Sequence, residues 1–120
     1  MLLFKKRFLE LIRQGKKTQT IRLWKHRRMR AGQRSYIPGV GYIRIDAVDQ
    51  VSPAELTDED AHRDGFDSVD KLRAEIERLY PGEAAAGRGV YRVRFTVLPP
   101  DEQQRLREQR QRRKNAKTAD

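Results

Sequence analysis

The stretch Gly15-Lys16-Lys17-Thr18-Gln19-Thr20-Ile21-Arg22 joins a helical pattern to a strand pattern. On its N-terminal side, apolar residues recur at helical spacing, at Phe4, Phe8, Leu11 and Ile12. Gly15 predicts the end of this helix, because glycine readily adopts the left-handed conformation that follows a helix. On its C-terminal side, residues 18–23 alternate and include β-branched side chains, which predicts a strand. Side chains at such a junction can converge on a cleft.

The same stretch is rich in side chains that can take part in chemistry. A lysine such as Lys17 loses part of its preference for the charged form when a pocket desolvates it, and it can then act as a base. A threonine hydroxyl, such as that of Thr20, is a weak nucleophile unless a base lies beside it. Arg22 offers a planar fork that suits phosphate or carboxylate. The residues alone leave open an exposed turn with ordinary surface lysines.

Further strand and helix patterns alternate along the chain beyond this junction. Strand patterns cover residues 34–37, 42–51 and 91–97, and Ile43, Ile45 and Ala47 share one predicted face of the second strand. Two helix patterns follow the predicted N-cap residues Thr57 and Ser68. Strands that interleave with two or three helices predict an α+β fold, with a small mixed sheet that curls toward a barrel.

The length of 120 residues predicts one folded domain followed by a polar tail. Hydrophobic residues make up 37% of the chain and the mean hydropathy is −0.92, so the predicted core is modest. Beyond Pro99-Pro100 the sequence contains one large apolar residue, Leu106. We therefore predict a domain over residues 1–98 and a basic C-terminal tail over residues 99–120, which is either a solvated helix or disordered.

The net charge of +10 is concentrated at one end of the chain. Residues 1–47 contain 13 basic and two acidic residues, a net charge of +11, whereas residues 48–98 carry −4 and residues 99–120 carry +3. This asymmetry predicts a polyanionic partner, most simply nucleic acid, and charge for solubility is the plainer alternative. Cations interleaved with aromatic rings make up the predicted contacts with single-stranded nucleic acid: Lys16, Arg22, Trp24, Lys25, Arg27, Arg28, Arg30, Arg34 and Tyr36. For the tryptophan, burial in the core is an equal alternative.

The sequence also argues against several classes of site. Without cysteine, the chain has no disulfide scaffold, thiol nucleophile or thiolate zinc site, and its two histidines lack partners at metal-ligand spacing. We therefore expect no metal and no cofactor. No apolar run approaches the roughly 20 residues of a membrane span, and a secretory signal is lacking, which predicts a cytoplasmic protein.

Residues 15–22 resemble the signature of the ASCH family, which is approximately G-x-K-T-x-[ET]-x-R after an N-terminal helix. Residues 31–33 resemble the short turn that the family has before its next strand. Residues 56–61 resemble its L-T-x-E-x-A helix, and residues 64–66 resemble the acidic-Gly-aromatic step that follows. Similar likenesses cover a second helix and a closing strand, so the resemblance spans about residues 4–98 in the same order.

The resemblance implies a PUA-like small β-barrel flanked by helices, with RNA or a nucleoside bound in a cleft. Some small ASCH proteins remove the acetyl group from N4-acetylcytidine, and a few are described as ribonucleases. In the amidohydrolase branch a lysine, a threonine and an acidic residue are catalytic, and the matching residues here are Lys17, Thr20 and Asp64. That branch has glutamate where this chain has Asp64, a residue that also fits a polar helix end.

Two functions and a plainer alternative follow from these observations. The first is an RNA-binding module whose cleft recognises a base while residues 24–34 hold phosphates. The second is a hydrolase, either an N4-acetylcytidine amidohydrolase or a ribonuclease, in which Lys17 takes a proton from Thr20 and Asp64 donates one to the leaving group. The third is a protein-interaction domain whose basic tail meets an acidic partner. The first two predict RNA or a nucleoside as the partner.

Overall fold

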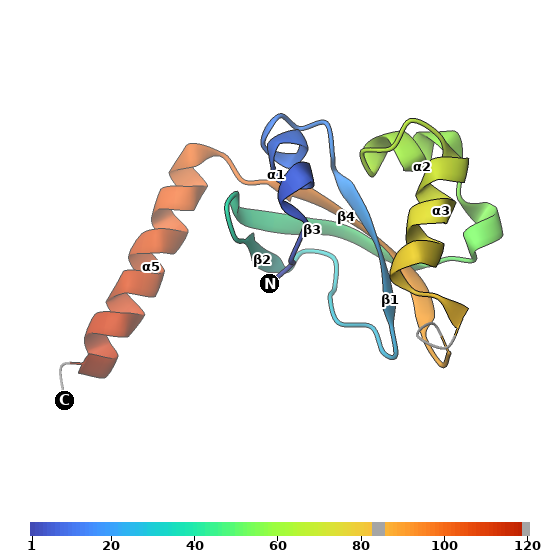
Figure 1. Ribbon diagram of the computed structural model, residues 1–120. Coiled ribbons are helices and arrows are strands. Elements are labelled where there is room, and N and C mark those ends of the chain that lie inside the picture. The colour runs from blue at the N-terminus through green and yellow to red at the C-terminus, as the bar shows by residue number, and fades with distance from the viewer. Residues whose placement is uncertain (83–85, 119–120) are drawn as a thin grey trace.

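Helix α1 (Lys6–Arg13) and strand β1 (Gln19–Trp24) form on the two sides of the junction, as the sequence patterns predict. The computed structural model describes residues 1–82 and 86–118 of the chain. Gly15 has a φ of 74°, in the left-handed region, and it follows the end of α1. The chain turns there, so that α1 packs on the sheet through the buried Ile12 (Figure 1).

The sheet contains four strands in the order β1-β4-β3-β2. The other three strands are β2 (Arg34–Ile37), β3 (Gly41–Gln50) and β4 (Gly89–Val97), and every pairing is antiparallel. The predicted α+β class, with helices beside the sheet, is confirmed. The expected mixed sheet is instead antiparallel, and among the described strands it stays open, with β1 and β2 at its edges. Four strands supply too little circumference to close a barrel.

A β-bulge in β3 changes which of its side chains face the core. The pairing with β4 shifts register between Ile45 and Ala47, and the buried residues on this face are Ile43, Ile45 and Val48. The extra residue of a bulge reverses the alternation of the strand beyond it. The prediction that Ala47 shares a face with Ile43 and Ile45 is therefore wrong.

Each face of the sheet carries a hydrophobic cluster. The larger cluster contains Ile43, Val93 and Phe95 of the sheet, and α1 packs against it. The second forms around Leu56, Ala61 and Leu72, where α2 (Asp58–Arg63) and α3 (Val69–Leu79) cover the other face. A short 3₁₀ helix (Pro53–Glu55) leads into α2. Helices thus cover both faces of the sheet, and the site forms at its β1 edge, where residues of α1, β1 and α3 line one cleft.

The helices α2 and α3 begin at the predicted N-cap residues. The side chain of Thr57 accepts a hydrogen bond from the backbone N–H of Asp60, and that of Ser68 accepts one from Lys71. Both predicted caps are confirmed. Such caps satisfy backbone N–H groups that have no partner within the helix, and each typically stabilises it by about 1 kcal/mol.

The tail forms helix α5 (Pro100–Thr118), which projects from the rest of the fold (Figure 1). Of the two forms expected for the tail, the structure has the helix, and residues 119–120 lie outside the described residues. A polar anchor attaches it, because the buried Gln103 side chain accepts from the Tyr42 N–H (2.8 Å) and donates to the Tyr42 carbonyl (2.7 Å). Gly41 leaves room for this amide, since a Cβ there would lie 2.8 Å from Gln103 Oε1. Among the described helices, none combines the length and apolar character of a membrane span.

Candidate functional site

A bend after α1 brings Lys17 and Thr20 into one cleft. The backbone N–H groups of Lys16 and Lys17 both donate to the carbonyl of Leu11, at 2.9 and 3.1 Å. The Thr18 N–H then donates to the carbonyl of Arg63 in α2 at 2.8 Å, and β1 begins one residue later. Since Lys17 precedes the strand, strand alternation does not separate it from Thr20, and both side chains line the same cleft.

Lys17 and Asp64 form a buried pair in this cleft. Lys17 is 2% exposed and Asp64 is 4% exposed. The lysine Nζ lies 2.5 Å from Asp64 Oδ1, and it also donates to the backbone carbonyl of Asp64. Asp64 is the C-cap residue of α2, whose last turn is tied to the bend by the bond between Thr18 and Arg63. This close approach of the backbone lets an aspartate reach the lysine.

Burial shifts both members of the pair toward their neutral forms. Three phenylalanine rings surround the ammonium, with centroids 4.6 Å (Phe8), 5.6 Å (Phe4) and 6.0 Å (Phe66) from Nζ. Burial lowers the pKa of Lys17, and the Asp64 charge offsets only part of this shift. Burial likewise raises the pKa of Asp64 against the opposing effect of the lysine. Burial thus favours the neutral form of each group, while their mutual contact favours the charged forms.

The second carboxylate oxygen of Asp64 has no protein partner among the described residues. This atom, Oδ2, is buried and accepts no hydrogen bond within the described part of the chain. Buried polar atoms usually have a partner, and an unpartnered one costs about 1–3 kcal/mol.

Arg22 holds the hydroxyl of Thr20. Its Nε donates to Thr20 Oγ1 at 3.1 Å, and its Nη2 donates to the carbonyl of Leu3 at 2.7 Å. A guanidinium that donates to a hydroxyl oxygen stabilises the alkoxide formed when the proton leaves. No hydrogen bond joins Lys17 and Thr20 in the described structure, so the hydroxyl proton is uncommitted.

The cleft that contains these groups is small and largely apolar. Its volume is about 130 Å³, and Phe4, Phe8 and Phe66 line its wall beside Lys17 and Asp64. At its edge, Leu3 is 64% exposed and Leu79 is 45% exposed. Apolar walls with a few converging polar groups are typical of sites for small ligands.

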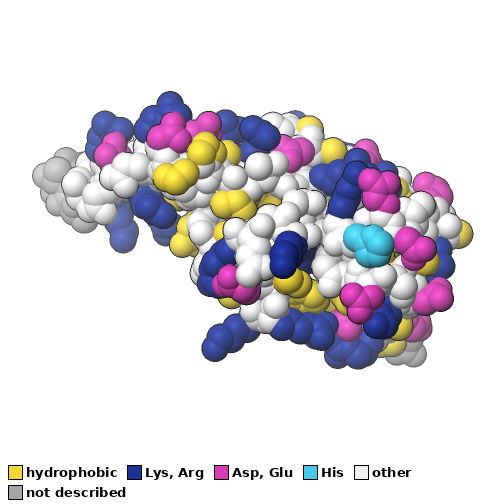
Figure 2. All heavy atoms as spheres, turned by 90° about the horizontal axis from the view of Figure 1, so that it is seen from above, with side chains coloured by type: hydrophobic (Ala, Val, Ile, Leu, Met, Phe, Trp, Pro, Cys, Tyr) yellow, Lys and Arg dark blue, Asp and Glu magenta, His cyan; other side chains and the backbone are white. Residues whose placement is uncertain are grey.

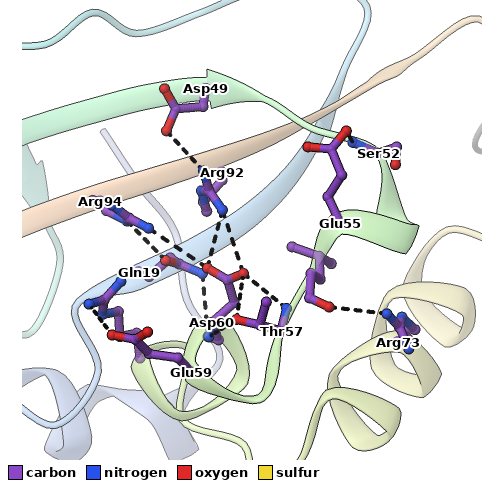
Figure 3. Close-up of polar contacts among 12 residues, drawn as sticks. Gln19, Asp49, Ser52, Glu55, Thr57, Glu59, Asp60, Arg73, Arg92 and Arg94 are labelled. Carbon is purple, nitrogen blue, oxygen red and sulfur yellow. Dashed lines mark hydrogen bonds and ion pairs between the residues drawn. The ribbon is translucent and has the colours of Figure 1, made fainter.

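A polar network holds α2 against the sheet beside the cleft (Figure 3). The Asp60 carboxylate accepts from the Thr57 N–H (3.0 Å) and from Arg92 Nη1 (3.3 Å), and it lies 3.8 Å from Arg94 Nη2. Gln19 donates to the Asp60 carbonyl and accepts from Arg94 Nε, both at 3.3 Å. Burial raises the pKa of Asp60, but the bonds from Thr57 and the charge of Arg92 outweigh it, so the net shift is downward.

The residues predicted to contact nucleic acid occupy several different places. Trp24 is buried, with its ring centroid 5.4 Å from that of Tyr91, so the alternative of core burial describes its position. Arg27 and Arg34 donate to backbone carbonyls, and Tyr36 is half-buried beside Tyr42. The remaining cations are exposed and make no ion pair with described residues: Lys16, Lys25, Arg28 and Arg30. None of residues 24–34 lines the cleft.

Sequence reasoning missed part of the cleft. The bond from Arg22 Nε to Thr20 Oγ1 was not predicted, and the expected contact of Arg22 with nucleic acid stays a prediction. The aromatic cage around Lys17 was not predicted, because the apolar spacing of α1 also fits an ordinary core helix. Within residues 1–82 and 86–118, no group of three or more His, Cys, Asp or Glu side chains is arranged to hold a metal.

Solved structures share this architecture. A hypothetical protein, PH0355, superposes with a TM-score of 0.67 at 20% identity, covering 80% of this chain and 95% of that one. An ASCH domain from Lactobacillus crispatus JV V101 superposes with a TM-score of 0.58 at 16% identity, covering 74% and 69%. The chain has the fold of an ASCH domain. Protein EF3133 from Enterococcus faecalis V583, assigned to family DUF984, has the same ASCH-like fold, with a TM-score of 0.59 at 21% identity and coverage of 77% and 70%. The sequence matches no family model and no curated protein.

Proposed function

We propose that the Lys17–Asp64 cleft hydrolyses the N4-acyl group of an acylated cytidine. The observation that carries this proposal is the buried lysine–aspartate pair with a threonine hydroxyl in the same cleft. A site that only binds a base gains little from burying two ionisable groups whose charged forms burial disfavours. The ASCH fold and the resemblance of residues 15–22 to the ASCH signature support the class of substrate.

In the first half of the reaction, the neutral amine of Lys17 accepts the proton of Thr20 Oγ1. Thr20 Oγ1 attacks the acyl carbonyl. The guanidinium of Arg22 stabilises the negative charge that develops on Oγ1 as its proton leaves. The protonated carboxyl of Asp64 then donates its proton to N4 as the C–N bond breaks. Cytidine leaves, and the site holds an acyl-threonine ester with a charged Lys17–Asp64 pair.

In the second half, water hydrolyses the ester. The Asp64 carboxylate accepts a proton from the water as it attacks the ester carbonyl, and the Lys17 ammonium returns a proton to Thr20 Oγ1 as it leaves. The carboxylic acid departs, and both groups regain their neutral forms. The observed contact between Lys17 and Asp64 keeps the two proton carriers together throughout.

The test is turnover of N4-acetylcytidine by the purified protein, followed as release of cytidine. Thr20→Val removes the hydroxyl at nearly constant shape, and we expect activity to fall by at least about 100-fold, whereas Thr20→Ser retains measurable activity. Lys17→Ala should lose activity to a similar extent, and Lys6→Ala, an exposed lysine of α1, serves as the charge-matched control. Lack of turnover by the native protein, or equal turnover by Thr20→Val, contradicts the proposal.

RNA recognition without hydrolysis is the second candidate function. The exposed cations Lys16, Lys25, Arg28 and Arg30 favour it, because they make no ion pair with any described residue and could neutralise phosphates. In this case the cleft would hold a base, and Lys17 would donate to it rather than act as a base. Binding of single-stranded RNA by a protein that fails to hydrolyse N4-acetylcytidine would support this function.

A further inference from the structure

A second groove lies between α5 and the β2–β3 hairpin. Its volume is about 410 Å³, and the residues that matter here are Tyr36, Tyr42, Arg107, Arg110, Gln111 and Lys114. It shares no lining residue with the Lys17 cleft. Any role of this groove is therefore separate from the proposed hydrolysis.

One wall of the groove is aromatic. Tyr36 and Tyr42 lie directly opposite each other in the antiparallel pairing of β2 and β3. Their ring centroids are 5.1 Å apart at an interplanar angle of 61°, and both residues are half-buried. Two half-exposed rings fixed on a sheet provide a rigid surface on which a nucleobase can stack.

The facing wall is cationic. Arg107, Arg110 and Lys114 fall on one side of α5, at positions i, i+3 and i+7. Arg107 and Arg110 are exposed and make no ion pair or hydrogen bond with any described residue. The neighbouring carboxylates are engaged elsewhere, since Glu102 lies 4.0 Å from Arg34 and Glu108 accepts from Gln104. The two guanidinium groups are thus available to an anion.

The composition of α5 favours nucleic acid over a membrane or a protein as the partner of the groove. The helix contains seven basic and three acidic residues, and Lys and Arg side chains stand along both of its sides (Figure 2). Leu106 is its one large apolar residue, so it lacks the apolar face with which an interfacial helix enters a membrane. It equally lacks the apolar centre typical of a protein–protein interface. Dense arginine without apolar surface matches a phosphodiester backbone.

We propose that the groove between α5 and the β2–β3 hairpin binds single-stranded nucleic acid. Arg107 and Arg110 hold consecutive phosphates, and Tyr36 stacks on a base between them. A duplex could reach the cations of the helix, but its paired bases would stay out of reach of the tyrosines. Single strands are therefore favoured over duplexes.

The experiment measures affinity of the full chain for fluorescent oligo(U) RNA by anisotropy, over a series of salt concentrations. Arg107→Gln with Arg110→Gln should weaken binding by about tenfold and reduce the salt slope by about 1.4, because each phosphate contact on a single strand contributes about 0.7. Tyr36→Leu should weaken binding by at least about fivefold with little change in slope. The matched control is Arg105→Gln with Arg112→Gln, which removes the same charge from the opposite side of α5 and should weaken binding less than threefold, or about 0.7 kcal/mol.

Further measurements identify which polyanion the groove prefers, and they test RNA binding at the groove separately from hydrolysis in the Lys17 cleft. Oligo(dT) of the same length distinguishes DNA from RNA, and a duplex RNA and a polyglutamate peptide should both compete at least about tenfold more weakly than oligo(U). Equal losses in the groove and control variants, or equal competition by polyglutamate, would overturn the proposal. Hydrolysis of free N4-acetylcytidine should be unchanged in the groove variants. A failure of hydrolysis therefore leaves the groove prediction testable, and a failure of RNA binding leaves hydrolysis testable.

Discussion

Lys17 and Asp64 are unusual because the fold gains little stability from placing them together. Replacing a buried ion pair by apolar residues is often neutral or stabilising, whereas removing one partner costs about 3–5 kcal/mol. The aromatic cage of Phe4, Phe8 and Phe66 makes the surroundings of Lys17 still less favourable to charge. A pair of this kind supports the hydrolysis proposed above, because stability does not account for it.

Replacing Asp64 with asparagine tests how burial controls Lys17. The Asp64 charge raises the pKa of Lys17, so Asp64→Asn should lower that pKa further, since burial then acts unopposed. Titration of the lysine side-chain resonances by NMR should show Lys17 releasing its proton at lower pH in the variant than in the native protein. The unfolded chain holds this proton up to the ordinary lysine pKa of 10.5. Between the lowered pKa of Lys17 in the folded variant and pH 10.5, the unfolded chain therefore binds more protons, and the stability of the variant should rise with pH.

The control for this titration is Asp58→Asn, which alters a carboxylate of α2 that does not contact Lys17. Its Lys17 resonance should titrate as in the native protein. If Lys17 in Asp64→Asn titrates at the ordinary value of lysine, burial does not control its protonation, and its proposed role as a base fails.

At the scale of single residues, the sequence predicts which side chains line the cleft better than it predicts the backbone geometry that brings them together. Lys17, Thr20 and Asp64 were named from a motif, and the structure places all three around one cleft. The bend that unites them depends on hydrogen bonds to Leu11 and Arg63, which no local pattern reveals. Their catalytic roles stay a prediction.

Among the elements, α1 and α3 are joined across the edge of the cleft by Glu75. This carboxylate accepts from Arg78 in its own helix at 2.6 Å, and it also lies 3.4 Å from Lys5 and 3.2 Å from Arg7 at the start of α1. The bonds from Arg78, with further help from Lys5, lower the pKa of Glu75 to about 2. The residue lines the cleft, so the same contacts set the spacing of its walls.

Glu75→Gln should therefore destabilise the fold in a pH-dependent way. A carboxylate with a lowered pKa stabilises the folded state above its ordinary pKa of 4.5, and this contribution disappears as the pH falls to about 2. We expect a loss of about 1 kcal/mol at pH 7 and none near pH 2, measured by urea unfolding. Glu77→Gln, on the same helix and without an ion pair to any described residue, should show no such difference. Equal losses in both variants at pH 7 would contradict this role.

Element boundaries followed the sequence closely where their signals are local, and the exceptions have nonlocal causes. The caps Thr57 and Ser68 and the stop at Gly15 are side-chain or backbone signals that act within a few residues, so they can be predicted. The bulge in β3 is set by the pairing with β4, about 50 residues away in the sequence, and alternation alone cannot show it. The Gln103 anchor is equally nonlocal.

At the scale of the whole molecule, two exposed basic surfaces lie outside the Lys17 cleft. One consists of Lys25, Arg28 and Arg30 in the loop after β1, and the other is the α5 groove with Arg107 and Arg110. Counting charges by segment locates the excess of basic residues in residues 1–47 and 99–120. It does not show that neither surface lines the Lys17 cleft. The α+β class was likewise predictable, whereas the open sheet depends on which strands pair.

Two surfaces on one molecule should make affinity depend on the length of the RNA. A strand of about 20 nucleotides that contacts both gains affinity by raising the effective concentration at the second surface, whereas about four nucleotides engage only one. Lys25→Gln with Arg28→Gln should therefore reduce binding of the long strand and leave binding of the short strand at the groove unchanged. The measurement is anisotropy with both lengths at one salt concentration. Equal losses for both lengths would show that the surfaces do not act on the same strand.

The placement of Lys17 in the protein interior also has a consequence for genetics. In a cell, destabilised proteins are removed by proteases, so a loss of 1–2 kcal/mol can change abundance several-fold. A missense change at Lys17 or Asp64 would therefore lower the amount of protein together with any activity, and its phenotype would resemble a deletion. Thr20→Val is the allele that separates the two effects, because it removes one hydroxyl and leaves the buried pair intact.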